Sequence, residues 1–241
     1  MEYYCITDIG LIRDKNQDSY LAISNEYDDL LVLVADGIGG GKAGEVASGE
    51  LIKYFDFIFK DSGPFESCED AIRFMEYHIE IANSIIFDLA NRYDSYNGMG
   101  TTLTGFLITK KGTISINCGD SRVYGFIDDM MVHLTRDDTL VNQMLDKGQI
   151  TYEESLNHPK KHYLVKAIGI FEKCSADIHE VKDMDYYMAC SDGLHSYVSD
   201  NEIKQIVSDE ELNVKQKVED LKDLSLLKGG YDNVTVVLVK R

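Results

Sequence analysis

Apolar residues alternate with polar ones, or run together, along several short stretches of the chain, and each such stretch predicts a β-strand. These stretches are 2–9, 30–35, 102–109, 113–118, 122–127, 186–190 and 234–239. In the fourth stretch Ile114, Ile116 and Cys118 alternate regularly with polar residues. The preceding residues 110–112, Lys-Lys-Gly, are therefore expected to form the turn of a β-hairpin.

Apolar residues recur at helical spacing in a second set of stretches, which predict helices. They are about 43–60, 69–91, 139–147, 201–208 and 213–228. The predicted helices follow one another largely in consecutive pairs between groups of strands, whereas a parallel sheet requires helices and strands to alternate. The pattern therefore indicates an α+β fold in which antiparallel sheets are covered by helices.

Length and composition indicate one domain. The 241 residues are enough to bury a substantial core. The prolines are only Pro64 and Pro159, and no linker-like segment divides the chain. We therefore expect residues 1–241 to form a single domain.

The chain is strongly acidic. Its 24 basic and 42 acidic residues give a formal net charge of -18, which argues against nucleic acid or an anionic membrane as a partner. No apolar run approaches the roughly 20 residues of a membrane span, and the N-terminus does not resemble a secretory signal. These features predict a cytoplasmic protein without membrane insertion, and the lack of a heptad repeat or an evident apolar patch favours a monomer.

The cysteines and histidines show no pattern typical of a disulfide framework or a zinc site. The five cysteines are scattered and contain no C-x-x-C pair, and the six histidines are not paired at metal-binding spacing. No cysteine has an arginine six positions later. The loop of the cysteine-dependent phosphatases is therefore absent.

The sequence DGIGGGKAG places a carboxylate before a glycine-rich segment between a predicted strand and a predicted helix. A phosphate-binding loop requires serine or threonine after its lysine, but Lys42 is followed by alanine. Gly39, Gly41 and Gly44 fit the spacing of a dinucleotide-binding loop, but a helical pattern follows where a second strand with an acidic end is needed. The third interpretation is that Asp36 binds a metal ion, although one Asp-Gly pair alone is most often a turn.

Aspartates flanked by small residues recur at the ends of predicted strands. Asp36, Asp120 and Asp192 each follow a strand, Asp232 precedes the last one, and Asp18 lies soon after the first. If these strand ends meet at one edge of the fold, like charges converge and cations are needed between them. Because such a ligand set offers only oxygen atoms, it favours magnesium or manganese over zinc.

Taken together, these segments resemble the metal-dependent serine/threonine protein phosphatases of type 2C in their compact bacterial form. The resemblance runs nearly end to end through GLIRDKNQDS, VADGIGGGKAGEVAS, GMGTTL, NCGDSRVY, LTRDDTLVNQML, HPKKHYLVKAIG, SDGL and YDNVTVVLV, in this order. It implies a β-sandwich of two mainly antiparallel sheets flanked by pairs of antiparallel helices, a four-layer αββα arrangement. It also implies a metal centre at one end and a flap within about residues 139–170.

The resemblance implies that Asp36 bridges two metal ions. The carbonyl of Gly37 would complete the coordination of one of them, since a glycine leaves its carbonyl free to turn toward the ion. Asp192 and Asp232 would bind the other ion.

Further residues would surround this pair of ions. By resemblance, Asp18 would hold metal-bound water just outside the ligands, and Asn233 would lie in the same outer layer. Asp120 would help to bind a third, looser ion beside the flap. Arg13 would bind the substrate phosphate, because a guanidinium group pairs with two phosphate oxygens at once. Arg122, at the start of a strand, is instead expected to pair with a core carboxylate.

The chemistry of this centre is consistent with phosphate ester hydrolysis. Two divalent ions about 3.5–4 Å apart turn a bridging water into hydroxide near neutral pH and hold the phosphoryl group for in-line attack. The expected activity is hydrolysis of phosphoserine and phosphothreonine in proteins, with two to three manganese or magnesium ions. The resemblance further implies a Ser/Thr protein kinase whose signalling the phosphatase opposes.

The chain departs from its relatives at a few positions near the expected site. Relatives often carry histidine at the position of Gly41, histidine and serine at those of Asp138 and Thr139, and arginine at that of Lys166. Some also carry, where Ile38 stands, a histidine able to protonate the leaving alcohol. None of these positions is an expected ligand, and the proton donor to the leaving group stays open.

Two other functions are compatible with the fold. A catalytically silent adaptor that binds phosphoproteins predicts lost ligands, whereas Asp36, Asp192 and Asp232 are all present. A small-molecule phosphomonoesterase with the same centre would be distinguished by its relative activity on phosphopeptides and metabolites.

Overall fold

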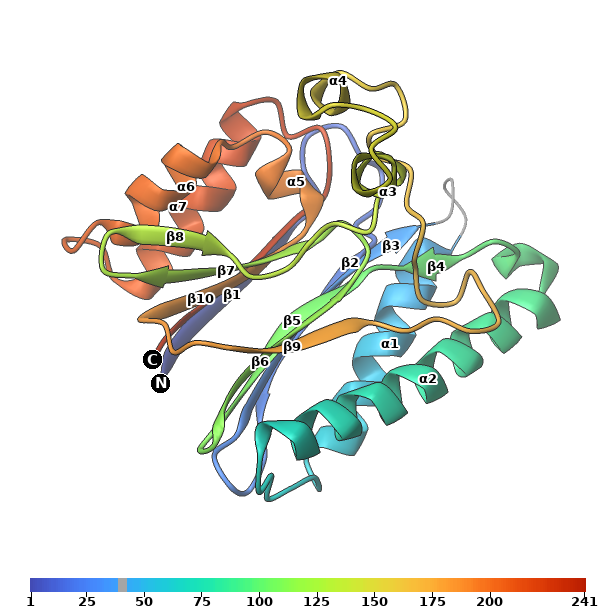
Figure 1. Ribbon diagram of the computed structural model, residues 1–241, viewed down its shortest axis with the longest axis horizontal. Coiled ribbons are helices and arrows are strands. Elements are labelled where there is room, and N and C mark those ends of the chain that lie inside the picture. The colour runs from blue at the N-terminus through green and yellow to red at the C-terminus, as the bar shows by residue number, and fades with distance from the viewer. Residues whose placement is uncertain (39–42) are drawn as a thin grey trace.

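Two antiparallel sheets lie face to face at the centre of the molecule (Figure 1). The computed structural model describes residues 1–38 and 43–241. The first sheet has the order β1 (Glu2–Asp8), β11 (Val234–Lys240), β10 (Tyr186–Cys190), β7 (Arg122–Ile127) and β8 (Met130–His133). The second has the order β2 (Asp18–Ser24), β3 (Leu30–Ile38), β5 (Leu103–Thr109), β6 (Gly112–Cys118) and β9 (Asp177–Val181), and β4 (Gly100–Thr101) pairs with β3.

Helices cover the outer face of each sheet (Figure 1). The second sheet is covered by α1 (Gly44–Phe59) and α2 (Cys68–Arg92), and the short 3-10 helix η1 (Asp94–Tyr96) follows α2. The first sheet is covered by α5 (Asp192–His195), α6 (Asp200–Ser208) and α7 (Val214–Leu227). The remaining helices, α3 (Leu140–Asp146) and α4 (Tyr152–Leu156), lie together at one end of the sandwich.

Apolar side chains fill the three spaces between these four layers. Strand β3 contributes to two of them, because successive side chains of a strand point to opposite faces. Leu31 and Leu33 pack against α1 and α2, whereas Val32 and Val34 pack between the sheets. A third cluster joins the first sheet to α5, α6 and α7. The predicted four-layer α+β sandwich is confirmed.

The predicted strands and helices are all present, with ends shifted by a few residues. The hairpin is also confirmed, since Thr109 pairs with Gly112 across Lys110 and Lys111. Four strands (β2, β4, β8, β9) and three short helices (α4, α5, η1) were not predicted. Strands β2, β8 and β9 lie at sheet edges and are partly exposed, so their patterns are weaker than that of the buried strand β3.

The segment 139–170 leaves the sandwich and returns to it through backbone contacts. An isolated bridge pairs Thr139 with Leu164, and another pairs Thr101 with Ile168. These contacts place α3 and α4 above one end of the two sheets (Figure 1). Within residues 1–38 and 43–241, no helix is both long enough and apolar enough to cross a bilayer.

Candidate metal centre

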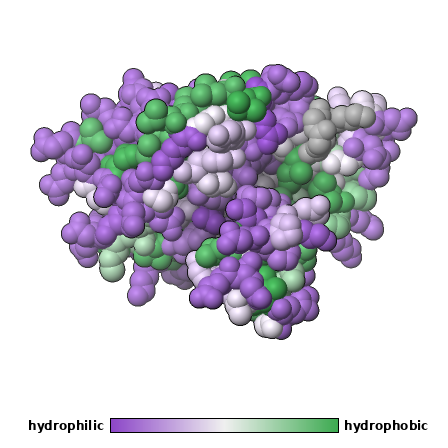
Figure 2. All heavy atoms as spheres, turned by 90° about the horizontal axis from the view of Figure 1, so that it is seen from above, coloured by the Kyte–Doolittle hydropathy of each residue, from purple (hydrophilic) through white to green (hydrophobic). Residues whose placement is uncertain are grey.

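A cavity of about 490 Å³ opens at the end of the sandwich, beside the segment 139–170. The face seen from this end is dominated by hydrophilic residues (Figure 2). The cavity lining brings together seven of the eight residues that the sequence nominated for the site: Arg13, Asp36, Gly37, Asp120, Asp192, Asp232 and Asn233. The eighth, Asp18, lies beneath the lining and is 7% exposed.

Asp36 is fixed near the end of β3 by two threonines of the GMGTTL segment. The Thr102 hydroxyl accepts a hydrogen bond from the Asp36 backbone N–H at 2.9 Å, and the Thr102 N–H donates to the Asp36 carbonyl at 2.8 Å. The Thr101 hydroxyl donates to the same carbonyl at 2.9 Å. With its backbone held from both sides, Asp36 has a fixed direction into the cavity.

Asp18 pairs directly with Asp36 across the antiparallel strands β2 and β3. Opposed residues of such a pair lie on the same face of the sheet, about 4.5–5.5 Å apart at Cβ. One oxygen of Asp18, Oδ2, accepts hydrogen bonds from the hydroxyls of Ser191 and Thr235, both at 2.7 Å. The other, Oδ1, is buried and has no partner among the described residues.

Asp192 is the first residue of α5, directly after β10. Its Oδ1 is also buried without a hydrogen-bond partner in the part of the chain that the structure describes. The following residue, Gly193, packs so closely on the start of β11 that a Cβ there would lie 1.9 Å from the Asn233 carbonyl oxygen. This contact brings Asp192 next to the loop that carries Asp232.

Asn233 ties the loop after β1 to the start of β11. Its amide nitrogen donates to the carbonyls of Ile9, at 2.8 Å, and Lys15, at 2.9 Å, and its Oδ1 accepts from the Gln17 N–H at 2.8 Å. These bonds position the loop from which Arg13 reaches Asp232, with 2.6 Å between Nη2 and Oδ2.

Gly37 is required by packing. A Cβ on Gly37 would lie 2.3 Å from the carbonyl oxygen of Gly44, in the first turn of α1, and 2.7 Å from that of Gln17. The backbone of Gly37 lines the cavity beside Asp36. Close approach of α1 therefore explains the glycine, whereas the sequence suggested only that its carbonyl must be free to turn.

The electrostatics of the cavity disfavour so many negative charges. Burial, together with the charge of Asp192, raises the pKa of Asp18 to about 7 and that of Asp120 to about 8. Burial, with the charge of Asp232, raises the pKa of Asp192 to about 6. Burial and the neighbouring Asp18 hold the pKa of Asp36 well above its usual range.

These residues fit divalent cations. Carboxylate oxygens converge on one cavity, two buried oxygens lack a hydrogen-bond partner within the described residues, and burial beside other carboxylates raises the pKa values of Asp18 and Asp36. An oxygen-rich ligand set of this kind suits a hard ion such as magnesium or manganese. Asp36, Gly37, Asp192 and Asp232 all line this cavity.

A comparison with protein families identifies the chain. The family model for protein phosphatase 2C matches residues 13–224. The chain belongs to the protein phosphatase 2C family. The matched residues include every nominated site residue except Asp232 and Asn233, which lie just beyond its end.

Individual members of the protein phosphatase 2C family match this chain over almost its whole length. The serine/threonine phosphatase stp of Listeria innocua is 34% identical, with 98% of this chain and 94% of that protein covered. The crystal structure of the serine/threonine phosphatase Stp1 from Staphylococcus aureus matches with a TM-score of 0.92 and 33% identity, over 100% of this chain and 94% of that one. The catalytic domain of the phosphatase PstP, solved in complex with two manganese ions, matches with a TM-score of 0.83 and 33% identity, over 99% and 97% of the chains.

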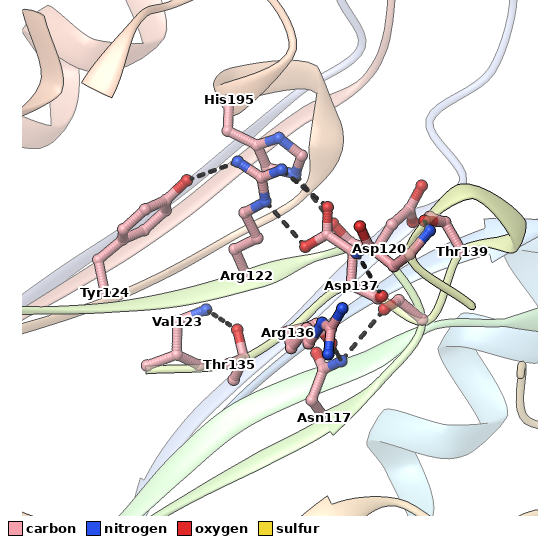
Figure 3. Close-up of polar contacts among 12 residues, drawn as sticks. Asn117, Asp120, Arg122, Val123, Tyr124, Thr135, Arg136, Asp137, Thr139 and His195 are labelled. Atoms are coloured by element: carbon pink, nitrogen blue, oxygen red, sulfur yellow. Dashed lines mark hydrogen bonds and ion pairs between the residues drawn. The ribbon is translucent and has the colours of Figure 1, made fainter. Parts of the chain in front are cut away.

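Arg122 is a structural residue in this phosphatase fold, as the sequence suggested. Its guanidinium makes two hydrogen bonds to the Asp137 carboxylate, at 2.9 and 2.7 Å, and donates to the Tyr124 hydroxyl at 3.1 Å (Figure 3). Next to this pair, His195 Nε2 lies 2.9 Å from the backbone carbonyl of Asp120. Arg122 and His195 thus support the turn that carries Asp120.

The positions at which the chain departs from its relatives have different surroundings. Ile38 lines the cavity, so no imidazole stands there. Lys166 forms ion pairs with Asp138, at 3.2 Å, and Asp177, at 2.9 Å. Gly41 lies outside the described residues, as do Gly39 and Lys42 of the glycine-rich segment.

Sequence reasoning missed His162. It lines the same cavity as the aspartates, although it lies far from each of them in the sequence. Its nitrogen comes within 4.8 Å of carboxylate oxygens of Asp120 and Asp192. Spacing along the chain gave no signal, because the three residues come from different segments.

Proposed function

We propose that this chain is a metal-dependent protein phosphatase that hydrolyses phosphoserine and phosphothreonine in proteins. The observation that carries the proposal is the convergence of Asp36, Asp120, Asp192 and Asp232 on one cavity beside Arg13. Membership of the protein phosphatase 2C family supports it. The manganese ions bound by the related PstP domain favour manganese or magnesium as the cofactor, in two to three sites.

Asp36, with the Gly37 carbonyl, and the pair Asp192 and Asp232 are the proposed ligands of two cations. When bound, these ions activate water as the nucleophile and offset the charge that develops on the phosphoryl group. The buried carboxylates hold the reacting groups in a fixed arrangement, which supplies much of the rate enhancement in phosphoryl transfer.

Arg13 is the proposed phosphate-binding residue. Its side chain is half exposed at the cavity and already forms a charge-assisted contact with Asp232. The guanidinium fork of Arg13 would be available for two oxygens of the substrate phosphate once a bound cation compensates the charge of Asp232. Arg13 thereby orients the phosphoserine or phosphothreonine for in-line attack.

The outer residues have positioning roles in this proposal. Asp18 accepts hydrogen bonds that fix Ser191 and Thr235 next to the site, and its free Oδ1 is available to a bound water. Asn233 holds the loop of Arg13. Asp120 is the proposed ligand of a third cation beside the flap, within about residues 139–170, and residues 1–241 act as one catalytic domain.

The proposed substrates are phosphorylated proteins. We infer that one of them is a Ser/Thr protein kinase, or a target of one, so that the phosphatase opposes its signalling. The proposal includes a cytoplasmic monomer that neither inserts into membranes nor binds nucleic acid, in line with the net charge of -18.

Phosphate release from a phosphothreonine peptide tests the function directly. The expected result is release with manganese, none after chelation, and recovery when manganese is added back. A small-molecule phosphomonoesterase would instead act mainly on phosphorylated metabolites, and an inactive adaptor would bind the phosphopeptide without releasing phosphate. Either result would overturn the proposal.

A further inference from the structure

A cluster of three potential ligands lies at the side of the cavity that faces the segment 139–170. Asp120, His162 and Asp192 each offer one atom, and these atoms lie within 4.8 Å of one another. Two atoms bound on opposite sides of one cation are about 4 Å apart. Small side-chain rotations are therefore enough to let all three bind one ion.

One member of this cluster lacks the partner that a buried polar atom normally has. The Oδ1 atom of Asp192 is buried and has no hydrogen-bond partner within residues 1–38 and 43–241. Asp120 lies beside it and is only 8% exposed. A carboxylate in this state indicates a missing ligand, because its desolvation is otherwise uncompensated.

The backbone beside His162 is held in place from two sides. The Tyr163 carbonyl accepts a hydrogen bond from the Leu140 N–H at 2.7 Å, and Leu164 forms a bridge with Thr139. His162 itself is exposed and, like Asp120, lines both the main cavity and a second cavity of about 490 Å³. Its imidazole thus enters the cluster from the segment 139–170, whereas the carboxylates come from the ends of the sheets.

We propose that His162 supplies a nitrogen ligand, together with Asp120 and Asp192, to a divalent transition-metal ion that joins the segment 139–170 to the sheets. The inference rests on the proposed function in one respect, since Asp192 is shared with the catalytic ions. The remaining coordination positions are filled by water, as is usual when a protein offers only three ligands.

The nitrogen ligand changes which metal this position prefers. Imidazole binds transition metals in preference to magnesium, whereas carboxylates accept both. The position of Asp120 therefore selects manganese over magnesium, while the oxygen ligands around Asp36 and Asp232 discriminate less. Because the ion also contacts the segment that carries His162, its binding fixes that segment relative to Asp120.

Pulsed electron paramagnetic resonance of the manganese-loaded full chain tests the ligand without measuring activity. With three equivalents of manganese, the wild type is expected to show coupling to an imidazole nitrogen. The coupling disappears in His162→Asn and in Asp120→Ala. The matched control is His158→Asn, another histidine of the segment 139–170 that is absent from both cavities, and it keeps the coupling.

Calorimetry gives the second measurement. In the wild type the weakest of the three sites binds manganese at least about tenfold more tightly than magnesium, and His162→Asn removes at least about tenfold of that manganese affinity. Because His162 is exposed, the variant is expected to keep the melting temperature of the wild type in chelator.

Nitrogen coupling that persists in His162→Asn, or that is absent from the wild type, overturns the inference. So does an unchanged preference for manganese in the variant. These failures are distinct from failure of the proposed function: a wild type that releases phosphate from phosphopeptides without nitrogen coupling refutes only the role of His162. A wild type without phosphatase activity refutes the proposed function, whatever the spectrum shows.

Discussion

Two glycines beside the site aspartates are fixed by packing. A Cβ on Gly37 would meet the Gly44 backbone, and a Cβ on Gly193 would meet the Asn233 carbonyl oxygen at 1.9 Å. In each case the glycine lets a second segment approach the backbone next to an aspartate that lines the cavity. The glycines of these Asp-Gly pairs are therefore needed for close contacts with other segments, whereas most Asp-Gly pairs only mark a turn.

Replacing Gly193 by alanine is expected to destabilise the fold. Backbone atoms surround the position, so overpacking costs about 1–3 kcal/mol or more. The matched control is Gly49→Ala in the middle of α1, where no atom lies within 4 Å of the added Cβ. That variant should gain about 0.5–1 kcal/mol, because alanine favours a helix over glycine. Urea denaturation of both variants checks the prediction, and equal stabilities would contradict it.

Removing the guanidinium of Arg13 should weaken substrate binding more than turnover. A hydrogen bond to a charged group contributes about 1.5–3 kcal/mol, so Arg13→Ala is expected to raise KM for a phosphopeptide by about ten- to a hundredfold. Arg13→Lys keeps the charge but loses the fork, and should recover only part of the effect. Steady-state kinetics at saturating manganese provide the measurement. Loss of manganese binding in Arg13→Ala would show that the residue supports the metal site instead.

Asp192 is expected to be essential for turnover. Asp192→Asn removes one negative charge and one oxygen ligand while keeping the shape of the side chain, and turnover should fall by at least about a hundredfold. Phosphate release at saturating manganese measures it, with the melting temperature in chelator as the control for folding. Near-normal turnover would refute the proposed role of Asp192.

At the scale of elements, every central strand of the two sheets could be predicted from sequence except the two-residue β4, whereas of the four edge strands only β1 was predicted. Strand β3 is buried on both faces, so its apolar residues run continuously and mark it clearly. Strands β8 and β9 are short, largely exposed edges of four and five residues, so neither offers a long apolar run or a long alternation. Helix α4 did carry a signal, since Thr151 and Glu154 form a capping box at its start.

The unrecognised strand β2 explains what the sequence could not show about the site. Asp18 was identified as a candidate from its motif, but its position opposite Asp36 depends on the pairing of β2 with β3. The convergence of Asp120 and Asp192 with His162 likewise depends on tertiary contacts between segments far apart in the sequence. Residue types and strand ends were predictable, whereas distances between them were not.

One side chain outside the loop 9–17, that of Asn233, contributes several of the contacts that hold it. Asn233 makes three hydrogen bonds to this loop, and loss of buried hydrogen bonds costs about 1–3 kcal/mol per group left unpaired. Asn233→Ala should therefore speed hydrogen exchange of the Gln17 amide by at least about fivefold and raise KM through Arg13. Exchange mass spectrometry of the peptide covering 9–17 measures the first effect. Unchanged exchange there would contradict the positioning role of Asn233.

At the scale of the whole molecule, the cavity holds only a few of the acidic residues behind the net charge of -18. Their negative charges nevertheless cost the folded state the most electrostatic free energy. Most acidic residues are exposed to solvent, which screens them. Those in the cavity are buried beside one another, and burial raises the pKa values of Asp18, Asp120 and Asp192. The arrangement therefore costs stability in the absence of cations and favours their binding.

This cost predicts how stability depends on pH. In chelator the folded protein keeps protons on Asp120, with a pKa of about 8, and on Asp18, with a pKa of about 7, whereas the unfolded chain releases them near pH 4. The folded state thus binds more protons between these limits, and the free energy of unfolding falls as pH rises. Burial lowers the pKa of His195 to about 3 and that of His133 to about 4, so these two histidines make the free energy of unfolding rise with pH. That rise ends above about pH 6.5, where the histidines of the unfolded chain have also lost their protons.

Urea denaturation between pH 6.5 and 8.5 therefore isolates the carboxylates. In chelator the free energy of unfolding is expected to fall by about 1–3 kcal/mol per pH unit, which corresponds to one or two protons. Saturating manganese binds the ionised carboxylates, so the decline should vanish and stability at pH 8 should rise most. Asp18→Asn should flatten the decline in chelator, whereas Asp56→Asn, at an exposed ion pair of α1, should leave it unchanged. A decline that manganese does not remove would show that these aspartates are not the groups that bind the cations.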